Sequence, residues 1–538
     1  MKASVEQMEV NAEELRRLVE RAGEAPLEPA GCQKLTALID TFEYVTQLLE
    51  NKQTTIHELR QLLLKPSTEK TAQVLRKAGI ESGEKKSPSS GAKSKAKGHG
   101  RNGAESYKAA QKVQVSHPSL KPGDPCPECQ QGKVYMQKEP GLLVRIVGQA
   151  PLQATVYQME RLRCNLCGEI FTAPAPDSVG TQKYDETSAS MIALLKYGSG
   201  FPFYRLEGLQ ENLEIPLPAA TQWEIVAQAA TPLQPVMDEL VRQAAQGKVL
   251  HNDDTSMKVL GLMKEVAAER NASDPLERTG VFTSGIVSTM DGQKIALFFT
   301  GRKHAGENLS AVLARRAAAL GPPIQMCDAL SRNLPKPLQV IVGYCLTHSR
   351  RRFVEVAPNF PSECRYVLEA LGEIYHHDEL AREQGMTPEQ RLYFHQAHSR
   401  PVMEKLHAWL TAQLEEKRVE PNSGLGQAIT YMRKHWERLT LFLRQAGAPL
   451  DNNLCERALK KAILHRKNAL FYKTEKGARV GDLYMSLIHT AELCGANPFD
   501  YLNELQKHAA DLLQNPHAWM PWNYRQTMEG TGGARLAA

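Results

Sequence analysis

The sequence has no long apolar run, and none of its segments is long enough to span a lipid bilayer. Its first ten residues also lack the basic and then apolar pattern of a secretion signal. We therefore expect a cytoplasmic protein with no membrane partner. The sequence also has no strong excess of positive or negative charge, since the formal net charge of the 538 residues is only +6. Any affinity for nucleic acid must then come from local basic patches.

The ten cysteines show no disulfide framework. Four of them stand in two Cys-x-x-Cys pairs, namely Cys126 with Cys129 and Cys164 with Cys167. In a reducing compartment such pairs predict one structural zinc ion held by four thiolates. Residues 142–147 and 154–159, between the pairs, have the composition of strands, so residues 122–178 are predicted to form a zinc-ribbon-like domain. Whether this domain also contacts DNA is left open by the sequence.

Residues 1–80 are predicted to be a helical region that joins copies of the chain. Apolar residues recur in steps of three and four from Leu35 to Leu63, which is the seam of a coiled coil and predicts a homo-oligomer. The alternative is an ordinary amphipathic helix packed on its own domain. Residues 81–121 are predicted to be a disordered basic linker, because residues 81–106 contain almost no large apolar side chains.

The chain is too long for one hydrophobic core, and we expect a multidomain α+β protein. Residues 247–478 have the strand and helix order of an RNase H-like catalytic domain. The predicted strands are 248–253, 280–290, 293–300, 324–328 and 338–345, with a helix over 307–320. Asp291-Gly292 is a strong two-residue hairpin turn. In this order the first and fourth strands lie side by side, which brings Asp253 and Asp328 together.

Helices are predicted in the rest of the chain. Residues 179–246 form a helical region, either a three-helix DNA reader that uses residues 221–223 or, as we favour, helices that pack on the next domain. A helical insertion, residues 349–450, interrupts the catalytic domain. Residues 479–525 form C-terminal helices, and the glycine-rich residues 526–538 are expected to be a flexible tail.

Three acidic residues stand out. Asp253 and Asp328 end predicted strands, and Glu456 lies in the first turn of a predicted helix that begins near Asn453. Each acid alone is more often a turn or cap residue. Three carboxylates that meet provide oxygen ligands for two divalent cations, and Mg²⁺ or Mn²⁺ suits such ligands.

The helix that carries Glu456 is also basic. Glu456, Lys460, Ile463 and Lys467 share one face, and the same surface is thickened by Arg457, Lys461, His465 and Arg466. We predict that Arg457, Lys460, Lys461, Arg466 and Lys467 contact DNA phosphates. A solvated charged face is the alternative.

Cys345 and His348 form a Cys-x-x-His at the end of the fifth predicted strand. The pair is either half of a second zinc site or a hydrogen-bonded support beside the catalytic acids, and we favour the support. The remaining cysteines have no partner in the sequence and are expected to be buried thiols: Cys32, Cys327, Cys364, Cys455 and Cys494.

These motifs together resemble the IS66 family of bacterial insertion-sequence transposases. The first family motif, His-x-Asp-Glu-Thr, stands at residues 251–255 with Asp254 in place of the glutamate. The second acid is Asp328, followed by Ala-Leu rather than Gly-Tyr. The family's Cys-x-x-His-x-Arg-Arg-x-Phe stands at residues 345–353, and Asp-Asn-Asn-x-x-Glu-Arg is intact at residues 451–457.

The resemblance implies a DDE-type DNA transposase with Asp253, Asp328 and Glu456 as its catalytic, Mg²⁺-binding acids. It further implies cleavage of the element's DNA ends and strand transfer to a target, in the cytoplasm at the nucleoid. Small accessory proteins encoded by the same element are the implied partners. The alternative is a zinc-ribbon DNA-binding protein whose catalytic domain has decayed.

Overall fold

The structure, a computed structural model, describes residues 112–136 and most of 143–180. It also describes residues 182–535 apart from 270–278, 291 and 337–339, together with Glu105. By its spatial contacts the chain divides into Met1–Ile80 and Glu81–Ala538. The predicted coiled coil and most of the predicted linker lie outside the described residues. The second unit is mixed α/β.

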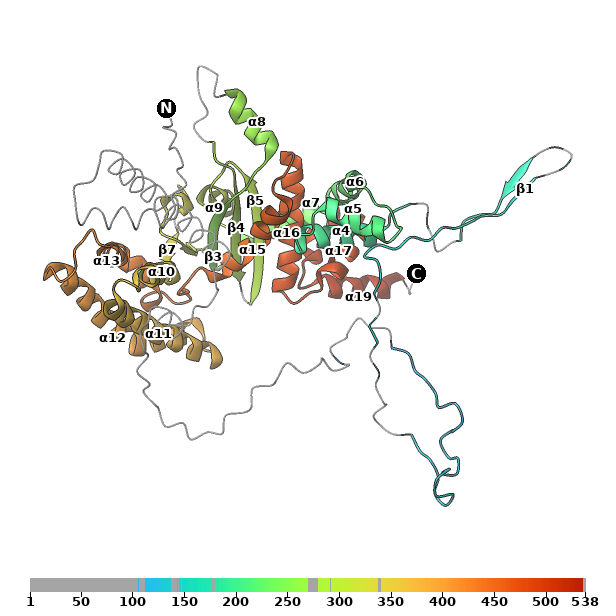
Figure 1. Cartoon of the computed structure of the whole chain (residues 1–538), viewed down its shortest axis with the longest axis horizontal. Helices are drawn as coiled ribbons and strands as arrows, with labels where there is room; N and C mark the ends of the chain where they lie inside the picture. The colour runs from blue at the N-terminus through green and yellow to red at the C-terminus, as the bar shows by residue number, and fades with distance from the viewer. Residues whose placement is uncertain are drawn as a thin grey trace, which may run out of the picture. The chain divides into compact units, whose positions relative to one another are not determined.

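A five-stranded mixed sheet forms the framework of the second unit (Figure 1). Its strands are β3 (Val249–Ser256), β4 (Phe282–Met290), β5 (Gln293–Gly301), β6 (Ile324–Cys327) and β7 (Ile341–Tyr344). The order is β5-β4-β3-β6-β7. β3, β4 and β5 pair antiparallel, whereas β6 runs parallel to both β3 and β7. Gly292, with a φ of 85°, makes the predicted tight turn between β4 and β5.

Two helices lie on opposite faces of this sheet. Asn308 of α9 (Ala305–Leu313) donates a hydrogen bond of 2.8 Å to Ser284 Oγ on β4. The next residue, Gly285, faces α15 (Asn453–Ala469), where an added Cβ would lie 3.0 Å from Leu459. Successive side chains of a strand point to opposite faces, so α9 and α15 cover opposite faces. The glycine lets α15 approach the strand closely.

The outer edge of β5 is closed by α16 (Glu475–Leu493). Three α16 side chains accept hydrogen bonds from alternate backbone N–H groups of β5: Asp482 from Thr300, Ser486 from Phe298 and Thr490 from Ala296. Side chains four apart lie on one helix face, which matches alternate residues of a strand. The edge therefore offers fewer free groups for pairing with another chain.

The helices that precede the sheet in the sequence and those that follow it pack into one hydrophobic core with the sheet. Before the sheet lie α4 (Glu186–Ala193), a π-helical turn (Leu194–Gly198), α5 (Phe203–Asn212), α6 (Ala219–Ala230) and α7 (Gln234–Ala244). After α16 come α17 (Pro498–Lys507), α18 (Ala509–Gln514), a 3₁₀ turn (Pro516–Trp519) and α19 (Tyr524–Arg535). Gln222 of α6 is fully buried and donates to the carbonyls of Phe203 and Leu217. This burial favours the packing alternative over a DNA reader at Gln222.

The helical insertion stands between β7 and α15, as expected. It contains α10 (Leu346–Val356), α11 (Pro361–Glu383), α12 (Pro388–Glu415), α13 (Gly424–Lys434), α14 (Trp436–Leu439) and a 3₁₀ turn (Leu441–Leu443). Residues 424–443 form three helical segments rather than one continuous helix, because the backbone leaves the helical conformation at His435 and Thr440. The insertion closes on itself through a 3.0 Å hydrogen bond from Leu346 N to Leu450 O.

Two expectations about the ends of this unit differ from the structure. Residues 154–159 form no strand, since their side chains are all exposed and have no sheet to pack on. The observed hairpin pairs β1 (Arg161–Arg163) with β2 (Ile170–Thr172) around the second cysteine pair. The expected flexible tail is helical as far as Arg535, because buried Tyr524 anchors the start of α19.

One helix, α8 (Leu260–Glu269), was not expected from the sequence. Its first amide groups donate to the carbonyls of Tyr472 and Lys473, far along the chain, and this pairing stabilises its start. No helix in the described part of the chain is long and apolar enough to cross a membrane.

We predict that Asp482 makes the stability of the fold depend on pH. Burial raises the pKa of this carboxyl from 3.8 to about 7. The folded protein then holds a proton that the unfolded chain releases. Stability is fully present below the unfolded pKa and falls by about 1.4 kcal/mol per pH unit as pH rises towards 7. Asp482→Asn keeps an acceptor for Thr300 N and should remove this dependence.

Urea denaturation of both proteins at about pH 5 and about pH 7 tests the effect. The wild type should lose roughly 2 to 3 kcal/mol relative to the variant between these pH values. Parallel losses in both proteins would show that Asp482 does not titrate in this range.

Candidate active site

Asp253 and Asp328 meet at two adjacent parallel strands: Asp253 lies within β3, which continues to Ser256 rather than ending at residue 253, and Asp328 directly follows β6. β3 and β6 pair from Val249 with Ile324 to His251 with Met326. Both acids stand two residues beyond the last of these pairs. Since the strands run in the same direction, the two carboxylates emerge side by side at one end of the sheet. The juxtaposition expected from the strand order is confirmed.

One buried amide links the two acids. Asn333 Nδ2 donates to Asp328 Oδ1 and, at 3.4 Å, to Asp253 Oδ1. The carbonyl of Asn333 accepts from Asn252 Nδ2 at 2.8 Å and from Gln325 Nε2 at 2.7 Å. These three amide side chains are fully buried. Asn333 was not expected at the site, since nothing in the sequence but its place five residues after Asp328 marks it.

The site concentrates negative charge. Burial raises the pKa of Asp253 to about 7, and the neighbouring Asp328 contributes to this rise. Within the described residues, neither acid forms a salt bridge with a lysine, arginine or histidine. Two adjacent carboxylates without a cationic partner match the oxygen ligands that divalent cations such as Mg²⁺ prefer.

Asp254 points the other way and is already paired. Its carboxylate contacts His304 Nδ1 at 2.9 Å and Arg332 Nη2 at 3.2 Å, and its side chain is only 1% exposed. The ring of His304 lies 4.3 Å from that of Phe282, which completes a closed cluster. The alternation of a strand thus separates the two neighbours, and Asp253 is the acid directed towards Asp328. Sequence reasoning missed both His304 and Arg332.

Asn452 fixes the start of α15 against the sheet. Its Oδ1 lies 3.2 Å from His251 Nδ1, and its Nδ2 donates to the carbonyl of Asn252 at 3.1 Å. Its backbone N–H donates to Cys345 Sγ at 3.2 Å. Burial lowers the pKa of His251 to about 4, so this imidazole is neutral near pH 7. With Asn452 Nδ2 already donating to a carbonyl, His251 Nδ1 carries the proton of the shared hydrogen bond.

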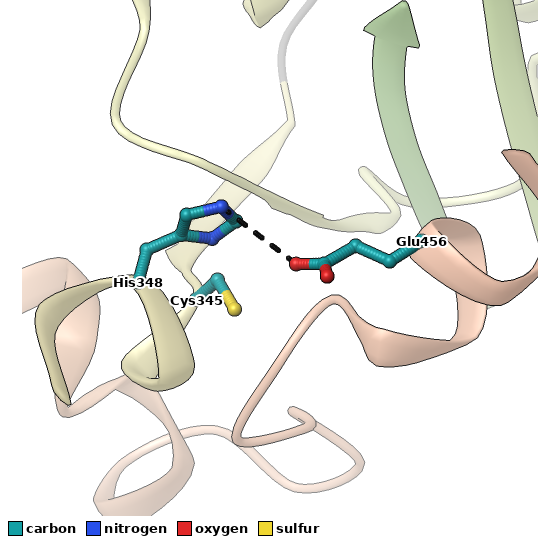
Figure 2. Close-up of side chains that lie close together, drawn as sticks. All are labelled: Cys345, His348 and Glu456. Carbon is teal, nitrogen blue, oxygen red and sulfur yellow. Dashed lines mark ion pairs between the residues drawn. The ribbon is translucent and has the colours of Figure 1, made fainter. Parts of the chain in front are cut away.

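Glu456, one turn further along α15, lies beside His348 and does not complete a cluster of ligand atoms with the two aspartates in the described residues. Its Oε1 lies 3.7 Å from His348 Nε2, and Figure 2 shows both side chains converging beside Cys345. One ligand atom from each of Cys345, His348 and Glu456 lies within 4.8 Å of the others. In the described part of the chain, Cys345, His348 and Glu456 are the one group of three side chains close enough to share a metal ion. The expected triad of Asp253, Asp328 and Glu456 does not meet this distance. Glu456 still adds to the raised pKa of Asp253, by less than Asp328 does.

Three of the expected basic residues on α15 serve the fold. Lys461 donates to the carbonyl of Gly198 and to Glu492 at 2.8 Å. Arg466 donates to Thr255 Oγ1 at 3.1 Å and to Ser256, which fastens the far end of α15 to β3. His465 was expected on the basic surface but is buried.

His465 lies between two tyrosine rings, 4.3 Å from Tyr472 and 6.3 Å from Tyr197. Burial lowers its pKa to about 3, so it carries no positive charge near pH 7. The remaining expected DNA-binding residues, Arg457, Lys460 and Lys467, are exposed. The basic surface of α15 is therefore narrower than the sequence pattern indicates.

The first cysteine pair forms a tight turn. Cys126 N donates to the carbonyl of Gly132 at 2.8 Å, and Gln130 N donates to the carbonyl of Cys126 at 2.8 Å. Hydrogen bonds from the backbone N–H groups of Gly132 and Gln131 lower the pKa of the Cys129 thiol. A thiol whose thiolate form is favoured in this way suits a zinc ligand. Of the second pair, Cys167 is described and exposed, whereas Cys164 lies outside the described residues.

Three of the unpaired cysteines, Cys327, Cys364 and Cys455, are buried free thiols as expected. Cys494 differs from the expectation, because it is only half-buried. Cys32 lies outside the described residues.

The family described as "Transposase IS66 family" matches residues 182–480, which is more than half of the chain. The chain belongs to the IS66 family of transposases, and the resemblance predicted from its motifs is confirmed.

Two curated proteins similar to this chain are both named as uncharacterized. The chain is 24% identical over 395 residues to the uncharacterized protein y4hP of Sinorhizobium fredii (strain NBRC 101917 / NGR234), over 69% of this chain and 68% of that protein. It is 25% identical over 389 residues to the uncharacterized protein y4jD of the same strain, over 69% of this chain and 72% of that protein. No solved structure matches the chain.

The contrast between two neighbouring lysines of α15 is testable. Lys461→Met removes hydrogen bonds to Gly198 and Glu492, and the free energy of unfolding should fall by about 1 kcal/mol. Lys460→Met, at an exposed position, should change it by less than about 0.5 kcal/mol. Urea denaturation measures both, and equal midpoints for the two variants would contradict the structural role of Lys461.

Proposed function

We propose that this transposase is a DDE-type enzyme with an RNase H-like core, which cleaves the DNA ends of its element and joins them to a target. The proposal rests on one observation above all. Asp253 on β3 lies beside Asp328, which directly follows β6, and α15 places Glu456 one turn from its anchored start. The strand order β5-β4-β3-β6-β7 is the order expected for such a core.

Asp253, Asp328 and Glu456 are the residues that would hold Mg²⁺ or Mn²⁺, two ions per site. Such ions activate water and stabilise a leaving oxygen in phosphodiester chemistry. The chain's own contribution is to orient the ligands. Asn333 donates to both aspartates and leaves their outer oxygens for a cation. Glu456 Oε1, a buried oxygen with no hydrogen-bond partner, would supply the third ligand.

DNA is bound by the exposed part of the basic helix. Arg457, Lys460 and Lys467 lie on the surface of α15, on the helix that carries Glu456. Cations at these positions attract DNA phosphates and fix the register of the duplex without reading its sequence. Lys461 and Arg466 act indirectly, because their hydrogen bonds hold the helix in place. A homo-oligomer and small accessory proteins of the same element complete the proposed assembly.

The assigned acids can be tested singly. Asp253→Asn, Asp328→Asn and Glu456→Gln should each abolish Mg²⁺-dependent cleavage of a linear DNA that carries the element's ends. Binding of the same DNA should stay within about twofold, because the affinity comes from basic residues elsewhere. Asp254→Asn is the matched control and should retain measurable cleavage, since His304 and Arg332 hold Asp254 away from the pair.

Gel analysis of cleavage and a DNA-binding titration at one salt concentration give both readouts. Wild-type strand transfer by Glu456→Gln in Mg²⁺ would exclude the triad. DNA binding by the wild type with no cleavage in either Mg²⁺ or Mn²⁺ would favour the decayed zinc-ribbon DNA-binding protein.

We further propose that Cys126, Cys129, Cys164 and Cys167 bind one structural zinc ion. The tight turn at the first pair and the hydrogen bonds to Cys129 support this. The double variant Cys126→Ser, Cys129→Ser should lose one zinc per chain by elemental analysis. Freshly purified wild-type protein without zinc would refute the site.

A further inference from the structure

We propose that Cys345, His348 and Glu456 form a binding site for a transition-metal dication such as Zn²⁺, which holds Glu456 away from the two aspartates and inhibits cleavage. The first observation is their convergence: a thiol, an imidazole and a carboxylate offer ligand atoms within 4.8 Å of one another. Figure 2 shows the imidazole and the carboxylate facing each other with the thiol beside them. The inhibitory role rests on the proposed function, whereas the metal site does not.

The backbone that carries these side chains is fixed on both sides. Cys345 caps α10 and His348 follows three residues later, so both side chains lie on the same side of its first turn. Glu456 occupies the first turn of α15. The two helix starts are tied together by the hydrogen bond from Leu346 N to Leu450 O and by that from Asn452 N to Cys345 Sγ. The three ligands are therefore preorganised, which reduces the entropy that binding must overcome.

The donor set selects the kind of metal. Sulfur and imidazole ligands favour Zn²⁺, Co²⁺ and similar ions, whereas Mg²⁺ prefers oxygen ligands alone. Three protein ligands leave the fourth position of a tetrahedral zinc site to water. Binding converts the Cys345 thiol to a metal-bound thiolate, and its proton passes to solvent. No electron is transferred.

A second observation points to a ligand. Glu456 Oε1 is buried and has no hydrogen-bond partner, and its 3.7 Å separation from His348 Nε2 is too long for a hydrogen bond. A buried carboxylate oxygen without a partner is costly. A dication between these groups would satisfy the oxygen and occupy the imidazole nitrogen. A Glu456 carboxylate bound to a dication beside His348 is held where it does not cluster with the aspartates, so occupation of this site opposes assembly of the triad.

Co²⁺ tests the site without reference to activity, because a thiolate bound to Co²⁺ gives a charge-transfer absorption band. The full-length double variant Cys126→Ser, Cys129→Ser removes the paired-cysteine site as a second source of this band. In that background we expect one Co²⁺ per chain with a thiolate band, lost on Cys345→Ser and reduced at least tenfold in affinity by His348→Gln. Serine can still accept the hydrogen bond from Asn452 N, and circular dichroism checks that each variant folds.

The site is overturned if the double variant gives no thiolate band, or if the band survives both Cys345→Ser and His348→Gln. For inhibition, Zn²⁺ is titrated into cleavage reactions that contain Mg²⁺. The half-inhibiting concentration, taken relative to each protein's own zinc-free rate, should rise at least tenfold in His348→Gln. An unchanged value would refute the inhibitory role.

The two proposals fail in different ways. A Co²⁺ band in a protein that never cleaves DNA would leave the metal site standing and remove the proposed enzyme. Cleavage without the band would do the reverse.

Discussion

The arrangement of the site depends on one buried side chain, Asn452. Its three hydrogen bonds reach β3 through His251 and Asn252, and the start of α10 through Cys345. Residues more than a hundred positions apart are joined by polar contacts that water does not reach. An unsatisfied amide in that place would cost on the order of 1–3 kcal/mol per lost partner. The position of α15, and with it that of Glu456, is therefore tightly constrained.

A second network of buried amide side chains lies beneath the two aspartates. Asn252 and Gln325 bond to each other and to the carbonyl of Asn333, which frees the side chain of Asn333 to face the two acids. A core of aliphatic residues could not present a donor at this point. The network therefore stabilises two adjacent carboxylates that burial and mutual repulsion otherwise disfavour, as the raised pKa of Asp253 indicates.

The sheet and the aspartate pair could be predicted from the sequence, because each depends on local signals. Alternating β-branched residues mark the strands, and Asp291-Gly292 marks their hairpin turn. The strand order then places Asp253 beside Asp328. The direction of Glu456 could not be predicted, since a helical pattern fixes a residue's face but leaves its side-chain torsions open.

The other differences between the sequence predictions and the structure come from contacts between residues far apart in the sequence. His465 reads as part of a basic stripe, yet tyrosines 197 and 472 bury it from both sides. The pairing of Asp254 with His304 and Arg332 joins residues 50 or more positions apart, which no local pattern encodes. In both cases tertiary contacts decide the role of a charged or titratable side chain, and periodicity alone does not.

The division of the acids between strands and helix has a physical consequence. Asp253 and Asp328 have short side chains on fixed strands, so their mutual repulsion is built into the fold. A third carboxylate beside them without a cation would add to that repulsion. Glu456 has a longer side chain, and its Oε1 lies 3.7 Å from His348 Nε2. Under the proposed mechanism, a divalent cation at the aspartates and the carboxylate of Glu456 therefore enter the site together.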